Sequence, residues 1–305
     1  MIPVTVINHA SGPSVLVMAG NHGDEYPGQI AIMKLARDLE PSAVRGKIIL
    51  IPCLNMPAAK ASARLSPLDG KNLNRSFPGN PEGTVTEVIA DFLTRVLFPI
   101  AEAVIDIHTG GRSMVFLPCS HMHVVPNRIQ RQKMLEAMLA WNTDFSFLYA
   151  DIAGNGLLPV EAENQGKVVV TTEMGGGEAV PAQVHQLTQR GLRNVLVHLG
   201  VLDGGVETRE DLGKPPAILV QALDRENYLL APESGIFEVT AELGTRVSVD
   251  EPIGQIHFLE RSDRGPETVL AKTKGYLICC RAPCLTQQGD CVAVIAQAVD
   301  PKTLL

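Results

Sequence analysis

Short apolar runs that alternate with helical patterns are the feature that most constrains how this chain can fold. Continuous apolar runs of this length are typical of strands buried on both faces of a sheet. They lie at 15–19, 47–52, 103–107 and 168–172, and two further strands are expected at 2–7 and 114–117. The spacing of apolar residues predicts helices between them, over 29–39, 84–98, 128–141 and 182–199. This alternation favours an α/β fold with a mixed, largely parallel sheet flanked by helices.

The character of the sequence changes after Gly204-Gly205. Lys214-Pro215-Pro216 has the composition of a linker, and short β-type runs separated by Gly and Pro turns follow it. We therefore expect two domains, over 1–207 and 208–305, the second a small all-β domain. Its pattern resembles the barrel-sandwich of lipoyl and biotinyl carriers. No lysine stands at an evident hairpin tip, however, so a carrier role is not expected.

Composition places the chain among globular proteins and excludes some classes of partner. Of its 305 residues, 45% are hydrophobic and 19% are charged. A net charge of −7 and a pI of about 5.6 argue against a nucleic-acid-binding surface. No apolar run reaches the length of a membrane span, and the first residues lack the basic and apolar regions of a signal peptide. The default expectation is a cytoplasmic protein with neither nucleic acid nor membrane as a partner.

The cysteines do not suggest a metal site. None has the C-x-x-C spacing of a structural zinc site; they are scattered, at Cys53, Cys119, Cys279, Cys280, Cys284 and Cys291. In a reduced cytosolic protein, such residues are expected to pack as small hydrophobes in buried strands.

The segment after the run at 15–19 carries the first candidate metal ligands. His22 and Glu25 stand on a turn between a predicted strand and a predicted helix, where ligands bind in open α/β sheets. An imidazole nitrogen and a carboxylate oxygen both bind zinc, at about 2.0–2.2 Å. Most pairs at this spacing are surface or helix-capping residues, so this pair needs support from elsewhere in the chain.

A third candidate ligand, His108, directly follows the predicted strand at 103–107. A His-Glu-His set is typical of catalytic zinc and leaves a fourth position open for water. Asp106 on the same strand is placed to orient His108 as a partner of its second ring nitrogen. Taken alone, His108 is explained equally well as a hydrogen-bonded histidine at the end of a strand.

Glu173 follows the predicted strand at 168–172 and precedes three glycines, Gly175-Gly176-Gly177. A carboxylate at this position is suited to act as the general base for a zinc-bound water and then to protonate a leaving amine. A solvated loop glutamate is the alternative. The glycines favour the first interpretation, because they permit close approach of the backbone to a ligand.

A long segment over 55–83, rich in Pro, Gly, Asn and Arg, is expected to lack regular structure and to carry function. It ends where Thr84 and Glu87 are spaced as the capping box of the next helix. Within it, Arg64 and Arg75 offer planar cations that suit a substrate carboxylate or a developing oxyanion. Without the other segments, solvated surface arginines would be the better interpretation.

Taken together, these segments resemble the succinylglutamate desuccinylase/aspartoacylase family, a branch of the zinc carboxypeptidase A-like fold. The resemblance extends along about the first 200 residues, and the β-rich tail is similar to the carboxy-terminal barrel domain of the family. The motifs that carry it are His22-Gly23-Asp24-Glu25, Asn72-Leu73-Asn74-Arg75-Ser76-Phe77-Pro78-Gly79, Asp106-Ile107-His108-Thr109 and Glu173.

The resemblance implies a carboxypeptidase-like fold, with a zinc-hydrolase catalytic domain over 1–207 that binds one Zn²⁺ per chain. It also implies a role for each matching residue. The metal ligands would be His22, Glu25 and His108. Glu173 would be the general base that activates water, and Arg64 would help to polarise the scissile carbonyl. The substrate carboxylate would be held by Asn74 and Arg75.

The implied reaction is hydrolysis of the amide that joins an acyl group to the nitrogen of a small amino acid. The sequence of residues 64–72 is most similar to that of family members near the N-α-acetyl-L-2,4-diaminobutyrate deacetylases, so the expected acyl group is acetyl. The link between Arg64 and Asn74 is longer than in aspartoacylase-type members, which argues against N-acetylaspartate. A homo-oligomer is compatible with this resemblance.

Two other functions stay open at this stage. One is a metallocarboxypeptidase that cuts short peptides. The other is a non-catalytic metabolite-binding protein, although such a protein has no need of a general base. His121 and His123 have metal-like spacing and are candidates for the pocket wall, but neither substrate contact nor zinc binding is the expected role of either.

Overall fold

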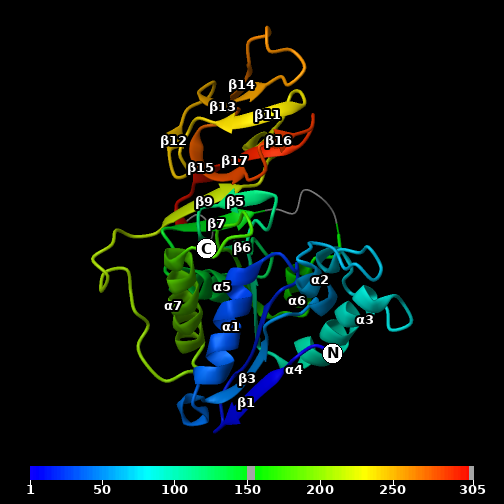
Figure 1. The fold of residues 1–305 in the computed structure, drawn as a ribbon. Helices are drawn as coiled ribbons and strands as arrows, with labels where there is room; N and C mark the ends of the chain where they lie inside the picture. Colours follow the sequence, from blue (N-terminus) through cyan, green and yellow to red (C-terminus); the bar gives the residue numbers. More distant parts are fainter. Residues whose placement is uncertain (150–154, 302–305) are drawn as a thin grey trace.

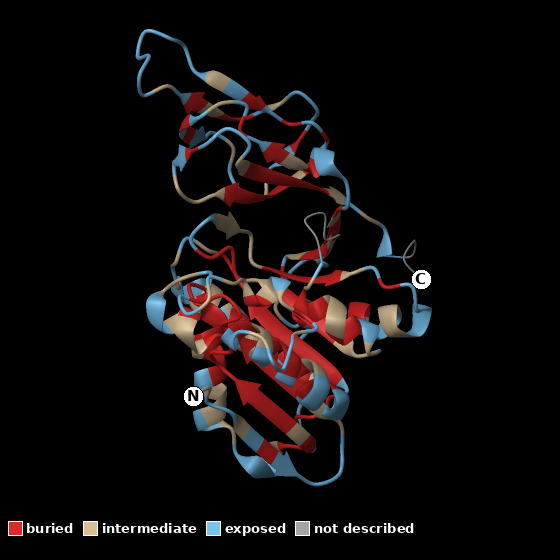
Figure 2. Ribbon diagram, turned by 90° about the vertical axis from the view of Figure 1, so that its right-hand side faces the viewer, coloured by how far each residue is buried: buried red, intermediate tan, exposed pale blue. Residues whose placement is uncertain are grey.

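The computed structural model describes residues 1–149 and 155–301. Figure 1 shows an α/β body, with helices packed around a twisted sheet, and a β-rich carboxy-terminal part stacked on one end of it. Figure 2 shows that buried residues concentrate along the central strands of the body. No helix in the described part of the chain is both long and apolar enough to cross a membrane.

The central sheet is mixed and largely parallel, as the sequence predicts. Strand β2 is parallel to β3 and β4, β4 is parallel to β8, and β7 is parallel to β6 and β9. The pairs β1–β3 and β6–β8 are antiparallel. Across the sheet the order is β1 (Thr5–His9), β3 (Gly46–Ile51), β2 (Ser14–Ala19), β4 (Ala103–His108), β8 (Val168–Glu173), β6 (Cys119–His123), β7 (Phe145–Tyr149) and β9 (Ile218–Ala222).

Both faces of the sheet are covered, which explains the continuous apolar runs. Along β2, Val15 and Val17 pack on the face that receives α1 (Tyr26–Asp38) and α7 (Ala182–His198). Leu16 and Met18 point to the other face, in the apolar cluster that also contains residues of α3 (Val85–Phe92) and α6 (Leu158–Asn164). Adjacent residues of a strand point to opposite faces, so every position of a strand covered on both sides is apolar.

The remaining helical segments differ in several places from the sequence expectation. The helix expected at 29–39 begins at Tyr26, and the one expected at 128–141 is α5 (Arg128–Ala140). The helix expected at 84–98 is continuous but has a π-helical turn in its middle. Its three parts are α3 (Val85–Phe92), η3 (Leu93–Leu97) and α4 (Phe98–Ile100).

The expectation that 55–83 lacks regular structure was wrong. The segment contains α2 (Met56–Ala61), which begins at the N-cap Asn55, and the 3₁₀ turn η2 (Leu73–Arg75). Elements absent from the sequence prediction are also present elsewhere: β6, β7 and α6 (Leu158–Asn164), and the 3₁₀ turns η1 (Pro41–Ala43) and η4 (Arg225–Asn227).

The carboxy-terminal part is antiparallel and shares a sheet with the body. Strand β17 (Cys291–Ala298) pairs with β9, β10 (Tyr228–Leu230) and β15 (Gly275–Arg281). Strand β15 also pairs with β5 (Met114–Phe116), from the body, and β12 (Arg246–Val247). One 13-stranded sheet therefore runs through both parts, and the domain boundary at residue 207 stays a prediction.

A second antiparallel sheet packs against the first through a separate apolar core. The core joins Phe237 and Ile256 of this second sheet to Leu277 and Ile295 of the first. The barrel-sandwich topology stays a prediction. The strand order is β14 (Glu267–Leu270), β13 (Pro252–His257), β11 (Gly235–Val239) and β16 (Leu285–Thr286).

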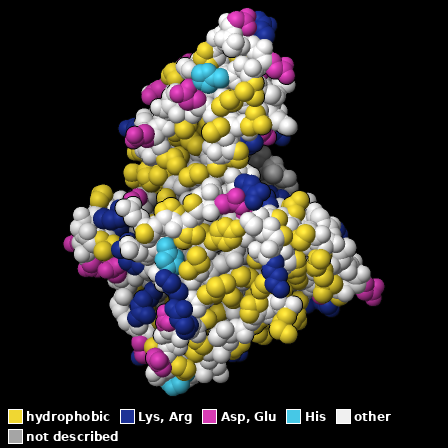
Figure 3. Space-filling model, viewed as in Figure 1, with side chains coloured by type: hydrophobic (Ala, Val, Ile, Leu, Met, Phe, Trp, Pro, Cys, Tyr) yellow, Lys and Arg dark blue, Asp and Glu magenta, His cyan; other side chains and the backbone are white. Residues whose placement is uncertain are grey.

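The expectation that the cysteines are buried holds for Cys53, Cys119, Cys279 and Cys280, but Cys284 is exposed and Cys291 is half-buried. On the face drawn in Figure 3, Lys and Arg side chains occur in separate small groups with acidic side chains among them.

Candidate active site

The predicted metal ligands meet at the carboxyl ends of two neighbouring parallel strands. His22 and Glu25 lie on the turn between β2 and α1, and His108 is the last residue of β4. Their ligand atoms lie within 4.8 Å of one another, and all three residues are buried. The sheet topology thus brings together side chains that are 83 residues apart in the chain.

Both histidines of this cluster turn the same ring nitrogen toward Glu25. The Nδ1 atoms of His22 and His108 lie 2.7 Å and 2.8 Å from its two carboxylate oxygens. The other ring nitrogens face fixed acceptors: His22 Nε2 is 3.1 Å from Asn72 Oδ1, and His108 Nε2 is 2.8 Å from Asp106 Oδ2. An Nε2–H that donates to such an acceptor leaves the Nδ1 lone pair for a metal ion. The donor set fits zinc.

Within this cluster the charged form of Glu25 is favoured, which suits a cation. Burial opposes the charged form of Glu25, but His22 and His108 outweigh it and hold the pKa of this carboxyl group well below its usual range. Burial lowers the pKa of His22. Burial acts in the same direction on His108, but Asp106 and Glu25 outweigh it and raise that pKa.

Close packing explains the glycine within the His22-Gly23-Asp24-Glu25 turn. A Cβ atom on Gly23 would lie 2.0 Å from the backbone carbon of Ala58, in α2. Its neighbour Asp24 accepts a hydrogen bond from the backbone N–H of Arg112, at 2.9 Å. The turn is therefore held between α2 and the loop that follows β4.

Glu173 is the last residue of β8 and pairs directly with His108 in the register of β4 and β8. Its Oε2 atom is buried and has no hydrogen-bond partner among the described residues. Burial raises the pKa of Glu173 to about 8, with a further contribution from the charge of Glu25. A carboxyl group with a pKa near neutrality can both accept and return a proton.

The three predicted residues of the 64–75 segment lie beside this cluster. Arg64 Nη1 is 3.3 Å from His22 Nδ1 and 3.5 Å from Glu25 Oε1, and its side chain is 44% exposed. Arg75 donates a hydrogen bond to the backbone oxygen of Asn74. The side-chain oxygen of Asn74 accepts one from the backbone N–H of Leu158, at 2.8 Å.

One cavity of about 530 Å³ joins these groups. All the site residues predicted from the sequence line it, so the structure brings together His22, Glu25, Arg64, Asn74, Arg75, His108 and Glu173. Its other walls include residues that the sequence did not single out. The carboxy-terminal part contributes Tyr228, Cys291 and Val294, and β7 contributes Phe147 and Tyr149.

Residues 11–199 match the model of the succinylglutamate desuccinylase/aspartoacylase catalytic domain. The chain belongs to this family. A curated relative in the family, the N-alpha-acetyl-L-2,4-diaminobutyric acid deacetylase of Halomonas elongata, is 38% identical over 300 residues. The match covers 98% of this chain and 86% of the relative, so it includes the carboxy-terminal part.

Solved structures of the succinylglutamate desuccinylase/aspartoacylase family share the whole fold. A succinylglutamate desuccinylase/aspartoacylase from Rhodobacter sphaeroides has a TM-score of 0.93 at 37% identity, over 98% of this chain and 89% of that one. The product-bound Ectoine utilization protein EutE (DoeB) from Ruegeria pomeroyi has a TM-score of 0.92 at 36% identity, over 97% and 89%. These matches confirm the predicted family and the mixed α/β fold.

The two histidines of β6 are not part of the cluster formed by His22, Glu25 and His108. His121 lines the cavity as a wall residue. His123 does not line it and instead faces Glu163 of α6, with Nδ1 2.9 Å from the carboxylate.

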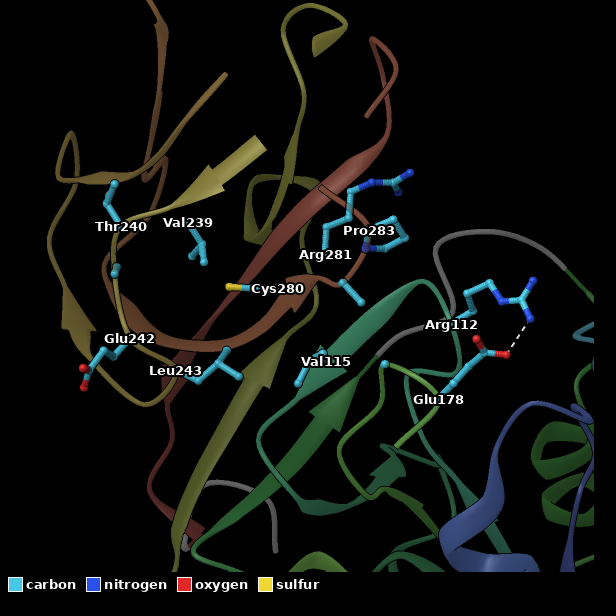
Figure 4. Close-up of a pocket in the computed structure, with 13 residues that line it drawn as sticks. Arg112, Val115, Glu178, Val239, Thr240, Glu242, Leu243, Cys280, Arg281 and Pro283 are labelled. Atoms are coloured by element: carbon cyan, nitrogen blue, oxygen red, sulfur yellow. Dashed lines mark hydrogen bonds and ion pairs between the residues drawn. The ribbon is translucent and has the colours of Figure 1, made fainter. Parts of the chain in front are cut away.

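A larger, open hollow of about 780 Å³ lies between the loops after β4 and β8 and the carboxy-terminal part. Figure 4 shows Arg112 and Glu178 pointing toward each other at its rim, where they form an ion pair of 2.6 Å. Cys280 lies inside, but burial raises the pKa of its thiol to about 12. The thiol therefore stays protonated near neutrality and is a poor nucleophile.

Proposed function

We propose that the protein is a zinc-dependent amidohydrolase that removes an acetyl group from the nitrogen of a small N-acyl amino acid, such as N-α-acetyl-2,4-diaminobutyrate. The observation that carries the proposal is the convergence of a His-Glu-His cluster, the buried carboxyl oxygen of Glu173 that has no partner among the described residues, and two arginines in one cavity. The similarity to the Halomonas elongata deacetylase along nearly the whole chain supports the choice of substrate.

In this proposal His22, Glu25 and His108 hold one zinc ion. Bound zinc supplies a Lewis acid that polarises the acyl carbonyl and lowers the pKa of water toward about 7. Asn72 and Asp106 fix the two imidazole rings, so the rings lose little further conformational freedom when the metal binds.

Glu173 moves the proton. Its carboxylate accepts a proton as the oxygen of water attacks the acyl carbon, and it later donates that proton to the amino nitrogen as the C–N bond breaks. The products are acetate and the free amino acid. Because Glu173 lies opposite His108 in the strand register, it faces the metal cluster without displacing a ligand.

The arginines of the 64–75 segment have separate roles. Arg64, beside the cluster, stabilises the negative charge that develops on the acyl oxygen; one such donor is worth roughly 2.7–4 kcal/mol in other hydrolases. Arg75 and Asn74 hold the α-carboxylate of the substrate, which orients the amide for attack.

The shape of the cavity favours a small substrate over a peptide. Tyr228, Cys291 and Val294 of the carboxy-terminal part line it. A metallocarboxypeptidase needs room for the residues that precede the scissile bond.

The test is amine release from a panel of substrates by zinc-loaded and chelator-treated protein. The panel contains N-α-acetyl-2,4-diaminobutyrate, N-acetylaspartate, N-succinylglutamate and several dipeptides. Metal-dependent turnover of the first compound above the others is the expected result. Turnover of dipeptides alone would show a carboxypeptidase, and tight zinc binding without any turnover would favour a binding protein.

A further inference from the structure

His121 lies on the same face of the sheet as the metal cluster. Thr171 of β8 pairs with Asp106 of β4 on one side and with His121 of β6 on the other. Directly paired residues point to the same face. Because neighbouring strands are about 4.8 Å apart, His121 lies one strand spacing from β8, which carries Glu173, and two from β4.

The contacts of His121 determine which of its ring nitrogens carries the proton. The hydroxyl group of Thr171 lies 2.9 Å from the backbone oxygen of His121 and 2.6 Å from its Nδ1. A carbonyl oxygen can only accept, so the single hydroxyl proton goes to it. The hydroxyl oxygen must then accept from Nδ1–H, which leaves Nε2 with a lone pair.

This lone pair is an unused acceptor in the cavity wall. His121 is only 6% exposed, and its Nε2 has no hydrogen-bond partner among the described residues. Burial lowers the pKa of His121 to about 3, so the ring is neutral near pH 7. A buried acceptor without a partner is unfavourable, so this nitrogen is suited to a ligand group that donates a hydrogen bond.

The surroundings of His121 suit a cation better than an anion. Arg64 and Arg75 are the cations among the described residues that line the cavity, and both belong to the 64–75 segment. The wall beside His121 is aromatic instead. The ring centroids of His121 and Tyr149 are 4.7 Å apart in a T-shaped arrangement, and the ring of Phe147 also contacts His121. A carboxylate buried here would lack a partner, whereas an ammonium group is attracted by aromatic rings.

We propose that His121 Nε2 accepts a hydrogen bond from the side-chain ammonium group of a diamino acid substrate and thereby selects for it. The inference rests on the proposed function and adds the residue that sets specificity. Glu173 pairs with Cys119, and His121 pairs with Thr171, so His121 lies diagonally across from Glu173, at about 7–8 Å. With the acyl carbon next to Glu173, the five bonds from that carbon to the γ-nitrogen of N-α-acetyl-2,4-diaminobutyrate, together with one hydrogen bond, can span this diagonal.

The test compares N-α-acetyl-2,4-diaminobutyrate with N-α-acetylnorvaline, in which a methyl group replaces the ammonium group. We expect the wild-type ratio of kcat/KM to favour the diamino compound. In His121→Leu this ratio should fall by about tenfold or more, mainly through KM, because a hydrogen bond to a charged group is lost. Unchanged ratios in this variant would overturn the proposal.

Thr171→Val provides a second variant if His121→Leu folds poorly. It keeps the imidazole but removes the hydroxyl acceptor of Nδ1–H, so the same ratio should fall. His123→Gln is the matched control, since His123 lies on the same strand but does not line the cavity. Its ratio should equal that of the wild type.

Calorimetric binding separates a failure of this proposal from a failure of the proposed function. L-2,4-diaminobutyrate should bind the zinc-loaded wild type more tightly than L-norvaline does, and His121→Leu should abolish the difference, whether or not any substrate is hydrolysed. Equal binding by the wild type would reject the subsite. An ¹⁵N spectrum that shows the proton of His121 on Nε2 would also reject it.

Discussion

At the scale of single residues, the site depends on pairs in which one side chain orients another. Asp106 and Asn72 each accept a hydrogen bond from the Nε2 of one histidine, and Thr171 does the same for Nδ1 of His121. A hydrogen bond of this kind fixes the orientation and the tautomer of the ring. We therefore expect the orienting residues to matter for metal and substrate binding without touching either.

Asp106→Asn tests this dependence. The amide keeps the shape of the side chain but loses the charge that supports His108, so zinc affinity should fall by about 10–100-fold. Competition with a chromogenic chelator measures the Kd. Asp24→Asn is the control, because Asp24 accepts from the backbone of Arg112. Equal affinities in the Asp106→Asn variant and the wild type would show that Asp106 does not support the ligand.

Glu173→Gln tests the general base. The variant retains the metal ligands, so its zinc content should match that of the wild type. Its kcat should fall by at least about 10²-fold, which is the lower end of the range for general acid–base catalysis. Elemental analysis and steady-state kinetics measure the two quantities. Near-normal kcat at full zinc content would remove Glu173 from this role.

At the scale of elements, α3 anchors the segment that carries Arg64, Asn74 and Arg75. Asp69 accepts hydrogen bonds from the backbone and the side chain of Thr86, at 2.9 Å and 2.8 Å, close to the start of α3. The predicted capping box is present there, with Thr84 N donating to Glu87 at 2.8 Å. A segment with little regular structure thus receives a defined position from a neighbouring helix.

Asp69→Ala is expected to loosen this segment. KM for the N-acyl amino acid should rise severalfold, because Asn74 and Arg75 lose their fixed positions, while zinc content stays the same. Steady-state kinetics at saturating zinc provide the measurement. Glu82 is exposed and lies between this segment and α3, so Glu82→Ala should leave KM unaltered. A wild-type KM in Asp69→Ala would contradict the anchoring role.

At the scale of the whole molecule, the two parts of the chain are one structure. Strand β9 continues the central sheet into β17, and β5 of the body pairs with β15. The carboxy-terminal part also supplies one side of the cavity. Neither part buries its sheet edge without the other.

We therefore expect thermal unfolding in a single transition, whose calorimetric and van't Hoff enthalpies agree. Removal of zinc should lower the Tm of this whole transition, because the metal binds only the native state. Differential scanning calorimetry with and without a chelator measures both effects. Two transitions, of which only one responds to the chelator, would show that the parts unfold independently.

Local pattern was sufficient for much of the fold. The apolar runs predicted β2, β3, β4 and β8, because these strands are buried on both faces and each is short and continuous. Local pattern failed for the short β7 and for β6, whose sequence Cys119-Ser120-His121-Met122-His123 mixes polar and apolar residues. These strands owe their place to pairing with distant partners, which no local pattern records.

The sequence by itself determined the family, the strand-and-helix order of the body and the set of side chains available for chemistry, since these follow from local periodicity and short motifs. Only the tertiary structure decided which ring nitrogens of His22 and His108 face Glu25, and which nitrogen of His121 has no partner among the described residues. It also decided that Tyr228 lines the cavity. Those features depend on strand register and long-range hydrogen bonds, which form only when segments distant in the chain pack together.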